Sequence, residues 1–401
     1  MKACFYKTDV TPDIPCHMGG YERKKKSEGV LDPIEVNTMA LQVQNTTLLI
    51  AMIDSICLDG DFVDSIQITL NQLTKIPKHQ IIISCIHTHS APCFFQLTFE
   101  QVPAETKLTH MLKQQVITDL LYCHTHMVEC NAKFSSCMID GIYGNRNQKE
   151  AWSDKAFYVL TFQHNEQLIG VFSNISTHPT LLGSHNYLLS ADLLGHIRLQ
   201  LQEHYQCPAL ISNGACGDVS TRFYRNTQDD VTSSAAKIMK QFLIKQQAIP
   251  LTMNSCQIGH CTYRVTVDFS NDPIHLSIRN QVEQSNLPMK DLYLHKCDIK
   301  ESFHAFTLLL SSTIAIYDEL VFITLPGDIL SGFGKRIKEA LPDKHVILLC
   351  YSGNYCNYFV PEAEYGQYFE TFNSRLPKGE ADKFIQKVIN CAKSLIYIAK
   401  E

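Results

Sequence analysis

The chain has 401 residues, and 45% of them are hydrophobic, which is enough for the core of one large domain or of two or three average ones. Its formal net charge is −5, and its one basic run, Arg23-Lys24-Lys25-Lys26, is too short to indicate nucleic-acid binding. No apolar stretch approaches the roughly 18 residues that cross a membrane. The first residues have neither the apolar core nor the cleavage site of a signal peptide, so we expect a cytoplasmic protein without stable membrane association.

The cysteine pattern argues against a disulfide scaffold. Sixteen cysteines are spread along the chain, and no two of them form a C-x-x-C pair. Several lie inside apolar runs, as Cys57, Cys85 and Cys350 do, and a free thiol there behaves as a small hydrophobic side chain. Cysteine zinc knuckles and thioredoxin-type redox motifs therefore do not fit this sequence.

Apolar runs with the composition of strands alternate with segments of helical periodicity along the chain. Three pairs of strand-like runs predict hairpins: 38–43 with 47–53, 157–162 with 168–173, and 306–317 with 320–325. Apolar residues at helical spacing predict helices near 64–73, 106–130, 193–201, 232–243, 333–340 and 384–398. Hairpins and helical crossovers together favour an α/β fold with mixed β-sheets flanked by helices, in a single large domain that spans 1–401.

One apolar, β-branched run ends directly in a pair of histidines. Residues 81–86 predict a buried strand, and His87-Thr88-His89 follows before a proline stops the segment. In an extended backbone residues two apart point the same way, so we expect His87 and His89 on one side of the strand end. Imidazole is the commonest metal ligand among side chains. The pattern indicates two zinc ligands or one ligand beside a proton donor, and two hydrogen-bonded loop histidines are the alternative.

Further polar residues also follow predicted strands. His178, Ser220 and Asp328 come after the runs 168–173, 208–212 and 320–325, and Tyr358 and Tyr368 lie in a tyrosine-rich segment after 346–351. The ends of different strands can meet in one crevice although they are far apart in sequence. The set therefore predicts a metal site. For Asp328 the alternative is the N-cap of the next helix, and the glycine-containing loop before Ser220 is either functional or a simple turn.

A series of different short motifs follows in a fixed order along almost the whole chain. They are Asp9-Val10-Thr11-Pro12, Met18-Gly19-Gly20-Tyr21, His87-Thr88-His89-Ser90-Ala91-Pro92, Asn145-Arg146-Asn147, His178-Pro179-Thr180, Gly217-Asp218-Val219-Ser220, Pro326-Gly327-Asp328 and Tyr358-Phe359-Val360. The ordered set resembles the neutral, non-lysosomal ceramidases, zinc amidases with a large α/β catalytic domain. The resemblance implies a ceramidase-like zinc hydrolase that corresponds to the catalytic N-terminal domain only.

The resemblance also implies a set of metal ligands. His87 and His178 would bind one zinc ion per chain, and Asp328 and Tyr358 would complete the shell. Asp328 stands where the family has a glutamate, which is longer by one methylene group. With the shorter arm, we expect that the start of the next helix moves inward, that Asp328 is a weaker ligand, or that a water molecule bridges the carboxylate and the metal.

The remaining matches imply roles around the metal. His89 would act beside it as a proton donor or orienting group, and Tyr368 would steady the oxyanion, although two residues are missing just before it. Arg146 and Ser220 would line the substrate end. Zinc lowers the pKa of a bound water toward about 7 and polarises a carbonyl group. Attack by Ser220 itself is the alternative mechanism.

These features lead to one expectation about function. We expect neither the secretion signal nor the C-terminal immunoglobulin-like domain of the family, and the sequence has little apolar surface for docking on a membrane. We therefore expect a zinc-dependent amidohydrolase that acts on a small soluble amide rather than on ceramide itself. The alternatives are an ester or lactone hydrolase, a catalytically lapsed protein that binds a small ligand, and a phosphoester-processing enzyme with two metals.

Overall fold

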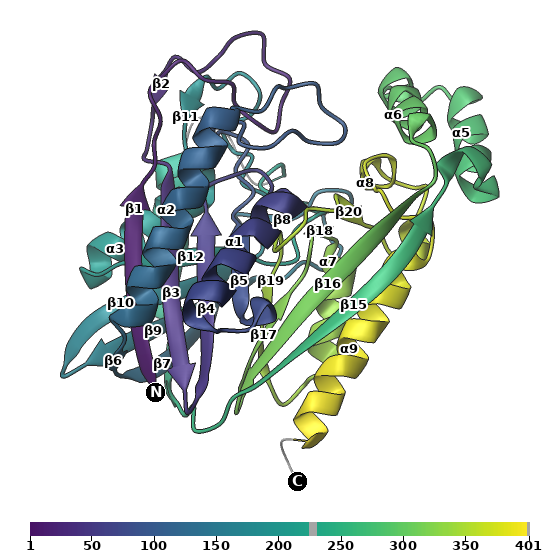
Figure 1. Ribbon diagram of the computed structural model, residues 1–401. Helices are drawn as coiled ribbons and strands as arrows, with labels where there is room; N and C mark the ends of the chain where they lie inside the picture. The colour runs from purple at the N-terminus through teal and green to yellow at the C-terminus, as the bar shows by residue number, and fades with distance from the viewer. Residues whose placement is uncertain (224–230, 399–401) are drawn as a thin grey trace.

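Three mixed β-sheets form the centre of the computed structural model, which describes residues 1–223 and 231–398 (Figure 1). The first sheet, in the order β5-β4-β3-β1-β6, contains β1 (Lys2–Asp9), β3 (Glu35–Val43), β4 (Thr46–Ile53), β5 (Ile81–Cys85) and β6 (Val128–Glu129). The second, in the order β12-β10-β9-β7-β14, contains β7 (Asn131–Met138), β9 (Ala156–His164), β10 (Gln167–Ile175), β12 (Ala209–Asn213) and β14 (Gln247–Leu251). The third, in the order β15-β16-β17-β19, contains β15 (Gln257–Val267), β16 (Phe306–Tyr317), β17 (Leu320–Thr324) and β19 (His345–Leu349).

The pairing of the strands confirms the mixed α/β fold. The three predicted hairpins are the antiparallel pairs β3–β4, β9–β10 and β16–β17. Each sheet also contains one parallel pair, namely β4–β5, β10–β12 and β17–β19. Parallel strands need a crossover, and in each case a helix lies between them in the sequence.

Helices cover the outer faces of the sheets, as Figure 1 shows. In the first sheet β1, β3 and β4 contact α2 (Thr106–Thr125), beside which lies α1 (Gly60–Thr74). The second sheet contacts α3 (Asp192–Tyr205) and α4 (Val231–Lys245), and the third contacts α9 (Glu380–Ile398). The remaining helices are α5 (Pro273–Glu283), α6 (Lys290–Ser302), α7 (Ser331–Glu339) and α8 (Phe369–Phe372). No helix in the described part of the chain is long and apolar enough to cross a membrane.

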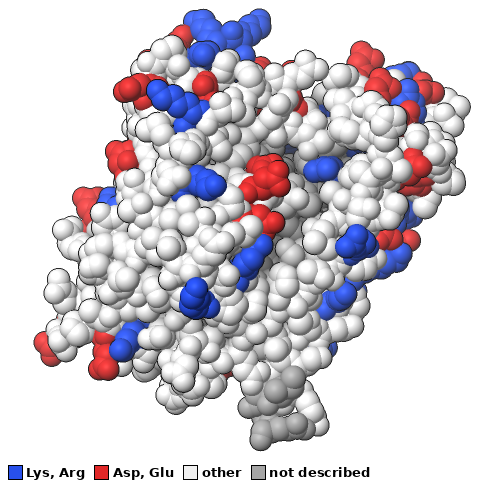
Figure 2. Space-filling view, viewed as in Figure 1, with Lys and Arg blue, Asp and Glu red and all other residues white. Residues whose placement is uncertain are grey.

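The inner faces of the sheets form a shared core. Phe5 of the first sheet contacts Phe162 of the second, with ring centroids 5.0 Å apart, and Phe172 of the second contacts Phe322 of the third at 5.4 Å. Covered on both faces, β4 is buried from Thr47 to Ile53, which explains its almost continuous apolar sequence. On the face drawn in Figure 2, acidic and basic side chains are interspersed apart from a small basic group at the top.

One asparagine joins the strand ends from which the site is built. The side-chain amide of Asn213, at the end of β12, donates hydrogen bonds of 3.1 Å to the carbonyl oxygens of Ile86 and Thr177. The backbone carbonyl oxygen of Asn213 accepts a hydrogen bond of 3.0 Å from the backbone N–H of Cys350, which follows β19. Asn213 is fully buried. Strand ends of all three sheets are therefore held together, and the segments that follow them lie side by side.

Candidate metal centre

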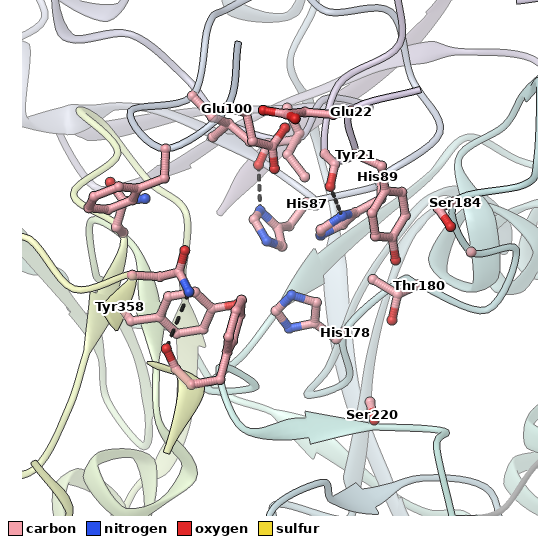
Figure 3. Close-up of a pocket in the computed structure, with 18 of the residues that line it drawn as sticks. Tyr21, Glu22, His87, His89, Glu100, His178, Thr180, Ser184, Ser220 and Tyr358 are labelled. Carbon is pink, nitrogen blue, oxygen red and sulfur yellow. Dashed lines mark hydrogen bonds between the residues drawn. The ribbon is translucent and has the colours of Figure 1, made fainter. Parts of the chain in front are cut away.

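Three histidines meet where these strands end. Each of His87, His89 and His178 offers a ring nitrogen, and the three nitrogens lie within 4.8 Å of one another. His87 follows β5 and His178 follows β10, and both are 2% exposed. Figure 3 shows the three rings around one cavity. The structure thus brings together His87 and His178, which follow two different predicted strands. It also places His89 near enough to both for all three to contact one ion.

The backbone at His87 differs from the extended form that we expected. The strand ends at Cys85, and His87 has a φ of 70°, in the left-handed region. The expectation that an extended strand end aligns His87 with His89 is therefore wrong, although their ring centroids are only 5.0 Å apart. A non-glycine residue in this conformation costs roughly 1–2 kcal/mol. Such strain persists where the surroundings hold it, and functional sites are typical places.

Hydrogen bonds fix the tautomer of all three rings. Nδ1 of His87 lies 2.5 Å from the carbonyl oxygen of Ile56, Nδ1 of His89 lies 2.9 Å from that of Gly20, and Nδ1 of His178 lies 3.2 Å from that of Cys216. A carbonyl oxygen only accepts, so each Nδ1 carries the proton and donates it. In the neutral ring the lone pair then lies on Nε2. This is the usual arrangement of metal-binding histidines.

Burial keeps these rings neutral. It lowers the pKa of His87 to about 3 and lowers the pKa of His89 and His178 well below the ordinary value. Nε2 of His89 is shielded from solvent and has no hydrogen-bond partner among the described residues. A buried polar atom without a partner is costly, and a bound ion removes that cost. The three rings are therefore ready to act as ligands.

Asp328 faces the same point from a short strand that follows β17 in the sequence and lies outside the three large sheets. Its Oδ1 lies 3.3 Å from Nε2 of His87 and 3.8 Å from Nε2 of His178. The residue is part of β18 (Asp328–Ile329), which pairs in parallel with β20 (Tyr358–Phe359), and α7 begins only at Ser331. Asp328 is therefore not a helix cap. Its short arm reaches the histidines because β18 itself lies inside the crevice, where the side chain is fully buried.

Two tyrosines that the sequence reasoning missed hold this carboxylate. The hydroxyl of Tyr351 donates 2.9 Å to Oδ1 of Asp328, and the hydroxyl of Tyr355 donates to Oδ2. Tyr351 also stacks on His87, with ring centroids 4.2 Å apart. Burial raises the pKa of Asp328 to about 6, and the two tyrosine hydrogen bonds oppose that rise. Both tyrosines belonged to the tyrosine-rich segment, but nothing in their spacing distinguished them from Tyr358 and Tyr368.

Arg146 and Tyr358 form a second wall of the site. Nη2 of Arg146 donates 3.1 Å to the hydroxyl of Tyr358, and Nε donates 2.9 Å to Oε1 of Glu370. The ring of Tyr358 is parallel to that of His178, with centroids 6.5 Å apart. Burial raises the pKa of Tyr358, so its hydroxyl stays protonated at neutral pH. The structure places this hydroxyl at the cavity, and its predicted role as a metal ligand stays a prediction.

Ser220 and Tyr368 lie in different places. Ser220 is in β13 (Val219–Ser220), which pairs with β8 (Gly144–Asn145), and it lines the same cavity as the histidines. Tyr368 instead lines a neighbouring cavity of about 270 Å³, where Nε2 of Gln148 donates 2.5 Å to its hydroxyl. In this structure Tyr355 is the tyrosine closer to the predicted ligands. The predicted oxyanion role of Tyr368 remains a prediction.

The residues present fit a zinc ion. Nitrogen ligands bind zinc at about 2.0 Å in tetrahedral geometry, so two of them lie about 3.3 Å apart on the ion. Nitrogens within 4.8 Å of one another reach that spacing by small side-chain movements. Imidazole and carboxylate are also the donor types that zinc takes in catalytic sites, where three protein ligands leave a position for water. His87, His178 and Asp328 would hold the ion, with His89 as an additional donor.

The site opens into a cavity of about 570 Å³. A cavity of this size accepts a small organic molecule. Apolar side chains from Leu97, Phe99, Leu182 and Phe369 share its walls with hydroxyl and charged groups. The substrate space is therefore mixed in polarity.

Comparisons with known proteins agree with this architecture. No protein-family model matches the sequence, and no curated protein sequence matches it. The neutral ceramidase from Pseudomonas aeruginosa is similar in structure, with a TM-score of 0.77 over 98% of this chain and 74% of that one. A ceramidase complexed with C2 has a TM-score of 0.75 over 99% of this chain and 75% of its own. Both share 14% sequence identity with this chain. The chain therefore has a neutral ceramidase-like fold, as the motifs indicated.

Proposed function

We propose that this protein is a zinc-dependent amidohydrolase that cleaves the amide bond of a small soluble substrate, such as an N-acyl compound, with one metal ion per chain. The observation that carries the proposal is the set of three neutral imidazoles, each with its Nε2 lone pair free and its nitrogen within 4.8 Å of the others, beside the Asp328 carboxylate. The neutral ceramidase-like fold supports it.

The bound metal would supply a hydroxide at neutral pH and a Lewis acid for the carbonyl oxygen. The chain's own residues supply the rest. The protonated hydroxyl of Tyr358, held by Arg146, donates a hydrogen bond to the oxygen on which negative charge develops. Because His89 is held through Nδ1, its neutral Nε2 would either bind the metal or accept a proton from the attacking water and pass that proton to the departing amine.

Elemental analysis and one variant test the proposal. Protein purified without added metal should contain about one zinc per chain, and His87→Ala should lose both the zinc and the turnover of an amide panel. His110→Ala is the matched control, because His110 is exposed on α2. Protein that contains no zinc and gains no activity when zinc is added would refute the proposal.

Two alternatives have specific support. Both oxygens of Asp328 already accept hydrogen bonds from tyrosine hydroxyls, which is compatible with a lapsed protein that only binds a small ligand. An ester or lactone hydrolase would use the same groups, since these substrates also develop charge on a carbonyl oxygen. An ester and amide panel separates these cases, because the lapsed protein turns over neither class.

A further inference from the structure

Charged side chains that the proposed reaction does not use line the same cavity as the histidines. Glu22 and Glu100 lie in the segments that precede β2 (Gly29–Val30) and α2, and Lys296 lies on α6. Figure 3 shows the two glutamates on one side of the cavity, with His87 and His89 between them and His178. The cavity thus has an acidic group and a basic group apart from its metal ligands.

The carboxylate of Glu100 lacks a full set of partners. Its Oε2 is shielded from solvent and has no hydrogen-bond partner among the described residues. Burial raises the pKa of Glu100 to about 7, and the positive charge of Lys296 opposes that rise. Oε1 of the neighbouring Glu22 accepts 3.1 Å from the backbone N–H of Gln101. Two carboxyl groups therefore lie on one wall of the cavity, and one of them has an oxygen without a hydrogen-bond donor. Such a pair can bind a cationic group of a ligand.

Lys296 is the corresponding unmatched cation. It is 7% exposed, and its ammonium group lies 5.3 Å from the ring centre of Phe99 and 5.9 Å from that of Phe369. Within the described part of the chain it makes no ion pair within 4.0 Å, although it interacts electrostatically with Glu100 and Glu22. Aromatic faces attract a cation but do not replace an anionic partner. The ammonium group can therefore still form an ion pair with a carboxylate of a ligand.

The other cation near this wall is already engaged. Arg23 donates hydrogen bonds to the carbonyl oxygens of Asn186, Gly19 and His89, at 2.7, 3.2 and 2.8 Å. Its guanidinium group fixes the segment that carries Glu22, and it is not a partner for a carboxylate of Glu22 or Glu100 within 4.0 Å in the described residues. Glu22, Glu100 and Lys296 thus each line the cavity without an ion pair within 4.0 Å among the described residues.

We propose that the substrate carries a zwitterionic group at the end away from the scissile amide. Its ammonium group binds to Glu100 and Glu22, and its carboxylate binds to Lys296, as the α-amino and α-carboxyl groups of an amino acid would. The substrate class is then an amino acid whose side chain contains the amide. This proposal rests on the amide hydrolase proposed above, and it assigns the residues that select the substrate.

Four acetamides of nearly equal length test it. Nε-acetyl-lysine has the zwitterionic head, N-acetylcadaverine has only the ammonium group, 6-acetamidohexanoate has only the carboxylate, and N-pentylacetamide has neither. Calorimetric titration of the His87→Ala protein measures binding without hydrolysis. We expect Nε-acetyl-lysine to bind at least 10-fold more tightly than N-pentylacetamide.

Variants in the same background assign each charge. Glu100→Gln should remove the preference for compounds with an ammonium group, and Lys296→Met should remove the preference for compounds with a carboxylate. Glu22→Gln, at an exposed position, repeats the first test without a change in the buried part of the wall. Glu28→Gln and Lys25→Met are matched controls, because these exposed residues pair with each other 3.0 Å apart on the surface.

The outcomes separate this proposal from the proposed function. Equal binding of the four acetamides, or preferences that survive in Glu100→Gln and Lys296→Met, would overturn the zwitterion site. If the zwitterion site is overturned in this way, turnover of N-pentylacetamide by the zinc-loaded wild-type protein would still support the amidase proposal. Conversely, selective binding of Nε-acetyl-lysine without turnover of any of the four would support the site and count against the amidase.

Discussion

Tyr351 donates a hydrogen bond of 2.9 Å to the same Asp328 oxygen that lies 3.3 Å from Nε2 of His87. The tyrosine therefore orients the carboxylate toward the histidines. Outer hydrogen bonds of this kind commonly change metal affinity by 10- to 100-fold. Tyr351→Phe keeps the ring that stacks on His87 and removes only the hydroxyl, so we expect about a 10-fold weaker zinc affinity. Competition with a chromophoric chelator measures it.

A matched control for that change is Tyr397→Phe, because Tyr397 is 67% exposed on α9. It should leave the zinc affinity unchanged. If Tyr351→Phe also binds zinc as tightly as the wild-type protein, Asp328 either does not bind the metal or does not need this hydrogen bond.

Gly20 positions His89 in a way that no other residue permits. Its φ is +89°, its carbonyl oxygen accepts the Nδ1–H of His89, and an added Cβ would lie 2.6 Å from that nitrogen. Gly20→Ala should therefore displace the imidazole and lower amide turnover by at least 10-fold. Gly141→Ala is the control, because Gly141 has a φ of +70° and no atom within 4 Å of the added Cβ. It should cost about 1 kcal/mol of stability and no activity. Full activity in Gly20→Ala would contradict the role of His89.

Arg198 forms a buried ion pair that holds α3 against the end of β4. Its Nη1 and Nη2 donate 2.5 and 2.8 Å to the two carboxylate oxygens of Asp54, and both residues are at most 1% exposed. Removing one partner leaves a buried charge alone, so Arg198→Met should lower the free energy of unfolding by about 3–5 kcal/mol. Arg336→Met removes a partly exposed pair with Asp382 and should cost no more than about 1 kcal/mol. Urea denaturation measures both, and equal losses would contradict this assignment.

Lys300 makes stability depend on pH in the alkaline range. It is 2% exposed, its Nζ donates 2.7 Å to the carbonyl oxygen of Thr371, and burial lowers its pKa to about 7 from 10.5. Between these two values the unfolded chain binds the proton and the folded chain releases it. The unfolded state therefore holds more protons, and stability rises with pH.

The size of this effect follows from the two pKa values of Lys300. From pH 7 to pH 9.5 the free energy of unfolding of the wild-type protein should rise by about 3 kcal/mol relative to that of Lys300→Met. Both proteins are denatured at the two pH values, and the difference between their free energies of unfolding is taken at each pH. The contributions of all other titrating groups cancel in that difference. A difference that stays constant, or that falls with pH, would show that the ammonium group remains charged in the folded protein.

Local patterns in the sequence predicted the strands that the candidate metal ligands follow. The hairpins and the strand ends that precede His87, His178 and Asp328 were predicted from apolar runs of the right length, because the periodicity of a strand is a local property. The ordered motifs predicted the neutral ceramidase-like fold, which the structural comparison confirms. Each strand and each motif depends only on residues that are close in sequence, and the order of the motifs along the chain is itself part of the sequence.

Tertiary structure decided how those segments meet. The left-handed backbone at His87, the hydrogen bonds of Tyr351 and Tyr355 to Asp328, and the separate cavity of Tyr368 all depend on strands from different sheets. Glu100 and Lys296 come from segments almost 200 residues apart, and no local pattern distinguishes them from the exposed charges of the chain. Sequence by itself therefore determined which strand ends carry the candidate site residues. Asn213 joins those strand ends, and their packing decided which side chains line the same cavity. Contacts between segments that are distant in sequence form only when the sheets pack together.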